Sequence, residues 1–434
     1  MKYLIKLKGE QLKLVKTLSV FFVLFLNTTI VNASDKFCDT KFDELLFKGL
    51  NSHPSIIVSK KLILGADLQL SSAKWGYYPT PTVDIARSSN NTRTTFRLDQ
   101  PLWAGGKIDA IRDKARSQKN EATYVHAESQ FQLIEDYLNT LQKYLQAQDK
   151  IDIMQNGVTQ LESIMQTIDR MIAAGELSMA DKNLLNTRIS DIHSSLEITQ
   201  AEFDVAKIQF EILTGYKIDC NISFNRSPIF SENINIELLV DEALNFHPSL
   251  KILNSKIEVA KSDVDSAEST LWPTLKLRGE HRKGALYDGD SATEENLVYL
   301  VLEMSTGAGA SALSNIERSK INVLKVKNQK LSKEKEVLDG LMNNYTRFIA
   351  VKNNIDILTN DIKIAEKVFK SNKRMFFLQQ KKWIEVVNAL SALNKKKISK
   401  AQLSGEYKSL EMKLALKTNR LSLETGEVLS DVLQ

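Results

Sequence analysis

The sequence predicts a mainly α-helical protein with a transmembrane β-barrel portion, in which one structural unit is duplicated. Three observations lead to this fold class: an internal repeat, long proline-free stretches with a 3–4 apolar rhythm, and two short segments that alternate as strands do. The chain has 434 residues, of which 43% are hydrophobic, 26% are charged and only 7 are proline. This composition favours long helices over disorder.

The internal repeat divides the chain into two similar halves. The segment Leu50–Ser55 (LNSHPS) recurs as Leu244–Ser249 (LNFHPS), an offset of 194 residues, and the same offset carries Pro79 onto Pro273. A repeat of this kind indicates a duplicated structural unit. The predicted boundaries are a signal peptide at 1–33, a first repeat at 34–215, a linker at 216–235 and a second repeat at 236–434.

The first 33 residues have the pattern of a secretory signal peptide. A lysine-rich start precedes the apolar run 18–26, and Val31-Asn32-Ala33 resembles a small-residue cleavage site. The apolar run is shorter than the roughly 18–20 residues that a membrane-spanning helix needs. An uncleaved N-terminal anchor is the alternative.

The net charge argues against a nucleic-acid partner. The formal charge is +5, but residues 1–33 hold five lysines and one glutamate, so the remaining chain carries only +1. A nucleic-acid binder needs its basic excess in the folded part. We therefore interpret runs such as Lys395–Lys397 as solvated helix faces.

Two proline-free stretches predict very long helices. No proline lies between Trp103 and Ser227, and none follows Pro273. Because proline inside a helix costs about 3 kcal/mol, both stretches are compatible with helix. A first helix from Gly106 to Ala173 would be about 100 Å long.

The apolar rhythm of these stretches predicts how the helices pack. Spacings of three and four recur at Ile134, Leu138, Leu141 and Leu145, at Leu161, Ile164, Ile168 and Met171, and at Leu338, Leu341, Tyr345 and Phe348. Such seams are typical of antiparallel coiled-coil packing. We expect long helices over about 105–215 in the first half and about 308–424 in the second.

One short segment in each half alternates between apolar and polar residues. In the first half it covers about 80–100, with a turn at Asn90-Asn91, and in the second half about 274–304. Alternation with charges on one face is typical of a barrel wall that has lipid outside and water inside. Aromatic residues near the segment ends fit an interfacial belt or, equally, packing at helix–strand joints: Trp75, Tyr77, Tyr78, Trp103 and Trp272.

Residue types that carry chemistry are few. Cys38 and Cys220 are the two cysteines; export permits a disulfide between them, and two free thiols are the alternative. His53 and His247 each precede a proline, which suits the first position of a helix, so we interpret both as helix-boundary residues. The other histidines lack ligating neighbours in sequence and no catalytic motif is found, so we expect neither an enzyme nor a cofactor.

The predicted order in each half is a short helix, a second helix, a hairpin, a very long helix and a long helix. In its duplicated form this order resembles the TolC-like outer-membrane efflux proteins, over about residues 40–430. Three signatures carry the resemblance: the Asn-x-His-Pro-Ser helix starts, the junction Gln100–Gly106, and Gly175–Ser178 followed by Asp181. The junction is similar to the family's Gln-Pro-Leu-Phe-x-Gly-Gly, and its second copy at 302–309 is degenerate.

The resemblance implies a homotrimer with a twelve-stranded barrel in the lipid bilayer of the outer membrane and a twelve-helix tunnel in the periplasm. It implies a passive exit duct that opens when a periplasmic adaptor (membrane fusion) protein and an inner-membrane ABC or RND pump engage it. Cys38 is not preceded by a lipobox, which favours type I protein secretion over the lipidated drug- and metal-efflux branch. Small-molecule efflux is the alternative within the family, and a secreted coiled-coil structural or adhesive protein is the alternative outside it.

The resemblance also implies a periplasmic gate near the helix turns. The family's Asp-Val-Leu-Asp-Ala segment matches Glu385–Ala389, so Glu385 would form a carboxylate ring, while Asn388 replaces the second acid. Asp181 is the counterpart of Glu385 in the first turn, at an offset of 204 residues. Phe376 and Lys381 match an aromatic and a basic residue that hold the family's closed state. The alternative interpretation of Glu385 and Lys381 is solvated helix.

The two turns would also contact the adaptor protein. Gly175, Leu177 and Ser178 match the family's contact turn, and Arg170 precedes them at the end of the first long helix. Arg374 repeats Arg170 in the second half, at the same offset of 204 residues. Ordinary capping of a helical hairpin is the alternative interpretation of this turn.

Overall fold

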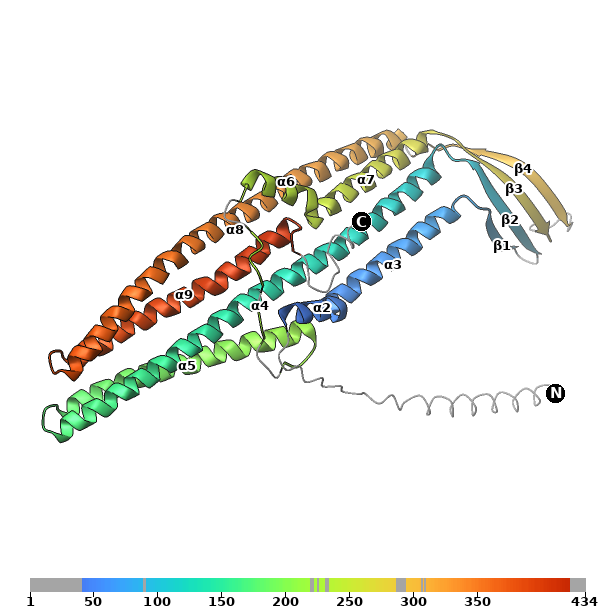
Figure 1. Cartoon of the computed structure of the whole chain (residues 1–434). Helices are drawn as coiled ribbons and strands as arrows, with labels where there is room; N and C mark the ends of the chain where they lie inside the picture. The colour runs from blue at the N-terminus through green and yellow to red at the C-terminus, as the bar shows by residue number, and fades with distance from the viewer. Residues whose placement is uncertain are drawn as a thin grey trace, which may run out of the picture.

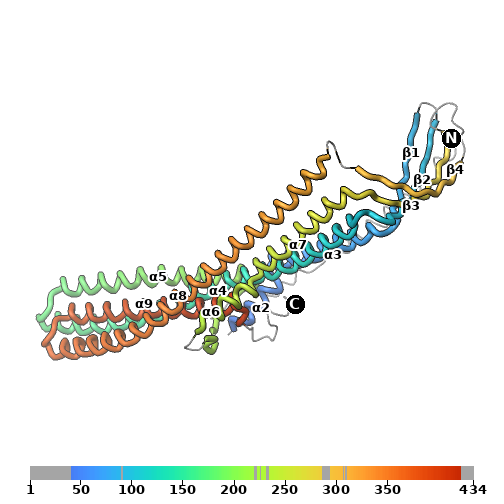
Figure 2. The backbone as a smooth tube through the Cα atoms, turned by 90° about the horizontal axis from the view of Figure 1, so that it is seen from above, coloured from blue at the N-terminus to red at the C-terminus, as the bar shows by residue number. Residues whose placement is uncertain are grey.

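The computed structural model describes residues 41–88, 91–218, 222–224, 226–230, 234–285, 294–305, 307 and 310–421. The predicted signal peptide at 1–33 and the two cysteines, Cys38 and Cys220, lie outside these residues. The described part is strongly elongated. Its strands lie beyond one end of the helices, and two helix–helix turns form the opposite end (Figures 1 and 2).

The described elements follow the same order twice, as the sequence predicts. The first half contains α2 (Phe42–Ser52), α3 (Pro54–Trp75), β1 (Thr80–Ser88), β2 (Asn91–Trp103), α4 (Lys107–Ala173) and α5 (Met179–Thr214). The second half contains α6 (Ile236–Phe246), α7 (Pro248–Glu268), β3 (Thr274–Lys283), β4 (Glu295–Glu303), α8 (Ser311–Phe377) and α9 (Trp383–Lys417). A short 3-10 turn, η1 (Ser269–Leu271), precedes β3.

The helices α4 and α8 extend far beyond the size of an ordinary globular domain. Each contains 67 residues, which corresponds to about 100 Å at 1.5 Å per residue. Because neither helix contains proline, its hydrogen-bond ladder runs without interruption. Among the described helices, none has both the length and the apolar character that crossing a membrane requires.

Helices and strands share one lateral order. The sheet order is β1–β2–β3–β4, and the helices joined to these strands pack in the matching order α3–α4–α7–α8. Towards the helix turns the order becomes α5–α4–α9–α8 (Figure 1). One lateral edge of the molecule is therefore formed by β1, α3 and α5, and the other by β4 and α8.

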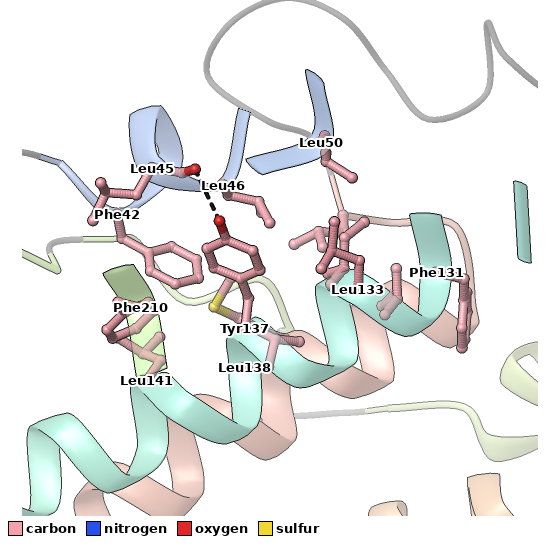
Figure 3. Packing of buried hydrophobic residues seen from close by; sticks show 14 of the residues in the cluster. Phe42, Leu45, Leu46, Leu50, Phe131, Leu133, Tyr137, Leu138, Leu141 and Phe210 are labelled. Carbon is pink, nitrogen blue, oxygen red and sulfur yellow. Dashed lines mark hydrogen bonds between the residues drawn. The ribbon is translucent and has the colours of Figure 1, made fainter. Parts of the chain in front are cut away.

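The largest hydrophobic core lies where α2 packs against α4 and α5 (Figure 3). Phe42 makes edge-to-face contacts with Tyr137 and Phe210, at ring-centroid distances of 6.5 and 6.3 Å. The Tyr137 hydroxyl donates a hydrogen bond of 3.3 Å to the Leu45 carbonyl, and burial raises the pKa of Tyr137. Helix α9 closes this core with Met412, Ala415 and Leu416.

The linker between the halves is fastened to both of them. The backbone N–H of Ile222 donates to the Tyr144 hydroxyl of α4 at 2.8 Å. Further along, the N–H of Ile229 donates to the buried Glu411 carboxylate of α9, also at 2.8 Å. Because each buried acceptor is satisfied by linker backbone, the linker joins α4 and α9 across the bundle.

His53 and His247 cap the helices α3 and α7. In both, Nδ1 accepts a hydrogen bond of 3.3 Å from the backbone N–H two residues later, and proline occupies the first helical position. The predicted role of both histidines as helix-boundary residues is confirmed. Only His247 is buried, and burial lowers its pKa to about 4.

The four strands form an antiparallel sheet with two different faces. The register sets Arg97 opposite Glu280 and Asp99 opposite Arg278. Side chains of alternate residues point to opposite faces, so these charged residues share one face. The other face is apolar and exposed, and carries Val83, Ile85, Phe96, Leu98, Leu277, Val298, Leu300 and Leu302.

Aromatic side chains gather where the strands meet the helices. Trp75 lies 5.2 Å from Tyr78 and Trp103 lies 6.2 Å from Trp272, measured between ring centroids. Trp75 is 69% exposed and Trp272 is 58% exposed, so the described chain leaves most of their surface uncovered.

Helix α5 carries a second apolar seam besides the one that packs on α4. Its members follow spacings of 3, 4, 3 and 4 and are all exposed: Ile198, Ala201, Val205, Ile208 and Ile212. We call this set the α5 edge seam. On the opposite edge, α8 exposes Ile321, Leu324 and Leu331 with the same rhythm. Both lateral edges therefore present coiled-coil surfaces.

Candidate functional site at the paired helix tips

Two helical hairpins end side by side at the end of the molecule that lies farthest from the sheet (Figure 2). Tip 1 is the turn between α4 and α5, at residues 174–178, and tip 2 is the turn between α8 and α9, at residues 378–382. All ten residues predicted for the gate and for the adaptor contact lie in these turns or in the adjoining helix ends.

Tip 1 is built by two complementary capping motifs. Gly175 adopts a left-handed conformation with φ of 78°, which lets the N–H of Glu176 reach the Met171 carbonyl at 2.8 Å. Ser178 and Asp181 then exchange side-chain to backbone hydrogen bonds of 3.3 and 3.1 Å, which caps α5. The Ser178 hydroxyl, together with the Trp383 indole, lowers the pKa of Asp181.

Tip 2 repeats the first motif with a different residue. Gln379 takes the place of Gly175 and adopts the same left-handed conformation, with φ of 58°. The N–H of Gln380 reaches the Met375 carbonyl at 2.9 Å, as Glu176 does in tip 1. A left-handed conformation costs a residue with a side chain about 1–2 kcal/mol, so the turn geometry is kept here against that cost.

Two side-chain hydrogen bonds connect the tips. The Trp383 indole N–H donates to the Asp181 carboxylate at 3.0 Å, and the Gln379 amide donates to the Glu176 carboxylate at 2.9 Å. The partners are 202 and 203 residues apart in sequence. We call this pair of hydrogen bonds the tip latch.

An apolar cluster lies directly behind the tip latch. Trp383 and Phe376 are only 4% and 3% exposed, and they pack with α4 and α5 residues such as Ile168 and Leu185. Between the tips lies an open groove of about 750 Å³. Its lining combines apolar and charged side chains: Met171, Glu176, Leu177, Asp181, Leu184, Phe376, Gln379, Lys381, Lys382, Trp383 and Ile384.

The residues predicted for the gate occupy three different environments. Glu385 and Asn388 are exposed on α9, and the Lys381 ammonium lies 2.9 Å from the Glu385 carboxylate. The hydrogen bond from Lys381 lowers the pKa of Glu385, so the carboxylate is ionised near neutral pH. Asp181 belongs to the tip latch, and Phe376 is buried in the cluster behind it.

The residues predicted for the adaptor contact form the outer surface of the tips. Gly175, Ser178, Arg170 and Arg374 are exposed, whereas Leu177 is half-buried against the apolar cluster. The Arg170 guanidinium bonds back to its own helix, at the Gln166 carbonyl and the Thr167 hydroxyl, both at 3.3 Å. Most of this surface is therefore open to a partner.

Sequence reasoning did not identify Trp383, Gln379 and Glu176 as members of the site. One signal was present: Trp383 begins the apolar 3–4 seam of α9, which continues through Val386 and Leu390. A tryptophan on such a seam is buried, and a buried indole N–H needs an acceptor. The identity of that acceptor depends on the packing of two hairpins that are distant in sequence. Among the described residues, no group of three or more side chains has the composition of a metal site.

No protein-family model and no curated protein matches the chain. Solved structures do match it. A membrane protein from Pseudomonas aeruginosa superposes with a TM-score of 0.75 at 13% identity, over 88% of this chain and 92% of that chain. For the outer membrane protein VceC of Vibrio cholerae the TM-score is 0.73 at 13% identity, over 87% of this chain and 95% of that chain. For the open state of the MtrE outer membrane channel of Neisseria gonorrhoeae the TM-score is 0.69 at 13% identity, over 88% of this chain and 90% of that chain.

The likeness spans nearly nine tenths of the chain. The chain has the fold of these outer-membrane channels. The family resemblance predicted from the sequence is therefore confirmed at the level of the fold. At 13% sequence identity, what the chain shares with these structures is the fold.

Proposed function

We propose that this protein is an outer-membrane exit duct that conducts cargo passively and carries out no enzymatic reaction. Its strands would lie in the outer membrane, and its long helices would extend into the periplasm. The observation that carries the proposal is the two-faced sheet, which continues strand by strand into a layer of long helices in the same lateral order. Such a layer becomes a tube when its two edges meet.

The edges support closure with further copies of the same chain. β1 and β4 are edge strands, and β1 runs antiparallel to the direction of β4, so β4 of one copy can continue the sheet onto β1 of the next. The α5 edge seam and the exposed seam of α8 lie on the same two edges as these strands. Head-to-tail contacts between such edges form a ring when the rotation closes.

The number of copies follows from the size of the side chains on the polar face. Two copies would give eight strands, and an eight-stranded barrel is just filled by its own side chains. The polar face carries long residues such as Arg97, Arg278 and Arg282, which need a wider interior. Three copies give twelve strands, the number that the resemblance to the TolC-like family implies, and a wider interior than eight strands leave, so we propose a homotrimer.

In such a trimer the two faces of the sheet would contact different surroundings. The exposed apolar face would contact lipid, and the charged face would line the lumen. Trp75 and Trp272, exposed where the strands meet the helices, would lie at the membrane–water interface on the periplasmic side. Strands of 9 to 13 residues match the 9–11 residues that a tilted strand needs to cross a bilayer.

The paired tips would form the gate. The tip latch holds the two hairpins of one chain together, and opening the periplasmic end requires them to separate. Glu385, exposed beside the latch, would contribute a ring of three carboxylates that favours cations. Asn388 contributes no charge, so a second acidic ring is absent from this proposal.

The exposed surface of the tips would receive the protein partners. We propose that a periplasmic adaptor protein contacts Arg170, Gly175, Ser178 and Arg374, with Leu177 beneath them, and that an inner-membrane ABC or RND pump supplies the cargo. Type I protein secretion is the cargo class that we favour, because Cys38 lacks a preceding lipobox. Small-molecule efflux is the second candidate within the same architecture.

Electron microscopy of the protein extracted from membranes with detergent tests the duct. We expect a threefold tube that projects roughly 100 Å beyond a micelle belt, as the lengths of α4 and α8 require. Filaments, or rods that form without detergent, would contradict the proposal and favour a secreted coiled-coil structural protein.

Loss of the tip latch should open the channel. Trp383→Phe keeps the apolar ring in the cluster but removes the indole N–H that donates to Asp181. In single-channel recordings we expect the open fraction to rise by at least about threefold, because the closed state loses a contact that the open state lacks. Trp272→Phe is the matched control, since it alters a tryptophan at the other end of the molecule. Equal open fractions in both variants would show that the hydrogen bond from Trp383 to Asp181 does not hold the channel closed.

A further inference from the structure

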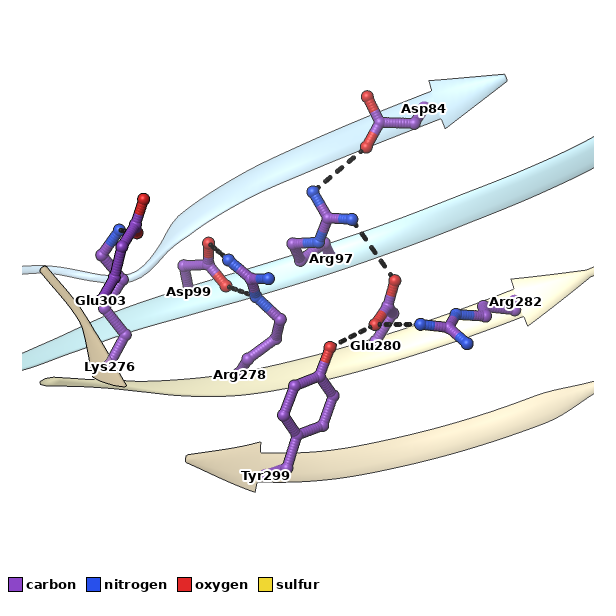
Figure 4. A network of polar contacts seen from close by, with 9 residues as sticks. All are labelled: Asp84, Arg97, Asp99, Lys276, Arg278, Glu280, Arg282, Tyr299 and Glu303. Atoms are coloured by element: carbon purple, nitrogen blue, oxygen red, sulfur yellow. Dashed lines mark hydrogen bonds and ion pairs between the residues drawn. The ribbon is translucent and has the colours of Figure 1, made fainter. Parts of the chain in front are cut away.

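The charged face of the sheet holds a row of polar contacts that crosses all four strands (Figure 4). Asp84 of β1 lies 3.4 Å from the Arg97 guanidinium of β2, which lies 3.4 Å from the Glu280 carboxylate of β3. The Tyr299 hydroxyl of β4 donates to the same carboxylate at 2.7 Å. Glu280 also accepts a hydrogen bond of 2.9 Å from Arg282.

A second set of ion pairs lies between this row and the helices (Figure 4). Arg278 makes a two-pronged contact with Asp99, with N–O distances of 2.6 and 2.8 Å. Nearer the helices, Lys276 lies 3.3 Å from Glu303. These contacts follow the strand register, which places each cation beside or opposite an anion.

The charges of this face balance each other. By alternation along the described strands, the face carries five acidic residues, Asp84, Asp99, Glu280, Glu295 and Glu303. It also carries five basic residues, Arg93, Arg97, Lys276, Arg278 and Arg282. A wall built in this way attracts neither cations nor anions on balance, although it is densely charged.

Glu280 has a special place in this balance. Its side chain is only 2% exposed, whereas those of Arg97 and Arg282 are 30% and 37% exposed. One covered carboxylate therefore lies between two guanidiniums that reach further into the solvent, and Asp84 and Glu295 are further anions within 4 Å of these guanidiniums. Removal of this one negative charge uncovers positive charge on the side of the sheet where solutes would pass.

We infer that Glu280 determines the ion preference of the strand-lined part of the channel, because it lies against both Arg97 and Arg282 and its charge completes the balance of this face. The inference rests on the proposed function, since the charged face must line the lumen of a trimer. Three copies would place three Glu280 carboxylates among six guanidiniums, so removal of Glu280 would leave three excess positive charges on an otherwise balanced wall. Rings of charged side chains set the selectivity of aqueous pores.

Planar-bilayer recordings of the full chain across a KCl gradient test the inference. Glu280→Gln keeps the shape of the side chain and its acceptor oxygen but leaves one excess positive charge per copy. We expect the ratio of chloride to potassium permeability to rise by roughly threefold or more over the parent channel, most clearly at low salt. The double variant E280Q/R97Q restores the balance, so its permeability ratio should return towards that of the parent.

Arg282→Gln is a second variant that does not depend on the stability of Glu280→Gln. Glu280 keeps Arg97 and Tyr299 as partners in this variant, and the face gains one excess negative charge per copy. We expect the permeability ratio to shift in the opposite direction. Assembly of each variant is checked by the migration of the unheated trimer on a gel.

The outcomes separate this inference from the proposed function. Opposite shifts for Glu280→Gln and Arg282→Gln, with recovery in E280Q/R97Q, support the role of Glu280. If both single variants conduct with the permeability ratio of the parent, the inference is wrong and the duct stands. If the parent chain forms no channel in the bilayer, the proposed function itself fails.

Discussion

At the scale of single residues, both halves of the duplication keep a histidine that caps a helix, but the burial of this histidine differs between the halves. His53 and His247 both accept the N–H of the serine two residues later. His53 is half-buried, whereas His247 is buried beside Phe131, with a ring-centroid distance of 4.9 Å. In the second half the motif has a pH-dependent consequence, because burial lowers the pKa of His247.

Protonation of His247 should destabilise the protein in mild acid. Burial, and to a smaller extent Lys417 and Lys333, lower its pKa from 6.5 to about 4. Because the folded-state pKa lies below the unfolded-state pKa, the stabilising contribution is complete above pH 6.5 and is lost as the pH falls towards 4. The loss amounts to about 3 kcal/mol, and thermal unfolding of the detergent-solubilised protein between pH 7.5 and pH 4.5, roughly the window of this shift, measures it.

His247→Asn is the informative variant for this pH dependence. Asparagine caps a helix through its side-chain oxygen but does not titrate in this range. We expect a lower melting temperature at pH 7.5, because the contact with Phe131 is lost, together with a flatter dependence on pH. His53→Asn, at the matching cap of the first half, is the control for the exchange of the capping residue itself. An unchanged slope in His247→Asn would assign the acid sensitivity to another group.

The tip latch shows where sequence reasoning reaches its limit at this scale. Gly175, Ser178 and Asp181 were identifiable because their motif is local, with glycine at the helix end and a capping pair three residues apart. The bond between Trp383 and Asp181 joins residues 202 positions apart, and no local pattern specifies it. Gln379 was equally hidden, since glutamine does not signal a left-handed turn.

At the scale of elements, the helices and hairpins were predictable and their lateral order was not. Prolines lie near one end of β1, β2 and β3 and are absent from α4, α5, α8 and α9, and the apolar rhythm separates helix from strand. The contact of α4 with α9, which belongs to the other half, follows from tertiary packing. At the junction between β2 and α4, Gly106 adopts a left-handed conformation with φ of 86°. Glycine adopts this conformation without steric cost, which explains the Gly105-Gly106 pair at the junction.

The seam between α4 and α9 depends on close approach at Gly405. A Cβ atom at this position would lie 2.7 Å from Cγ of Gln146 and 3.2 Å from the Gln142 carbonyl oxygen. Gly405→Ala should therefore destabilise the bundle by about 1–3 kcal/mol, because backbone atoms of α4 must move. Thermal unfolding in detergent measures the change.

Gly65→Ala in α3 is the matched control for this prediction. Nothing lies within 4 Å of the position that its Cβ would take. Alanine should stabilise the helix by about 0.5–1 kcal/mol, because glycine loses more conformational entropy on folding. Equal melting temperatures for the two variants would show that the seam tolerates a wider spacing.

At the scale of the whole molecule, the exposed seams indicate where further copies attach. Ile198, Val205 and Ile212 of the α5 edge seam are 54–68% exposed, although their spacing is that of a coiled-coil core. Apolar surface of this regularity on one edge is typical of an interface. It lies on the helical part of the proposed trimer, between the tips and the strands.

A charge in the α5 edge seam should break the assembly. Ile208→Lys places an ammonium among apolar side chains, and we expect the trimer to dissociate in gel filtration with detergent. Gln200→Lys, on the polar side of the same helix, adds the same charge outside the seam and should leave the trimer intact. A trimer in both variants would place the subunit contact elsewhere.

The pairing of β2 with β3 has a consequence for the order of folding. Arg97 and Glu280 face each other across this pair, although 183 residues separate them in the chain. The hairpin β1–β2 and the helices α4 and α5 are local, and they can form while the second half is still being synthesised or exported. Until β3 pairs with it, β2 has an unpaired edge that can form hydrogen bonds with strands of other chains. The four-stranded sheet is therefore completed late, and the protein enters the bilayer in the last stage of folding.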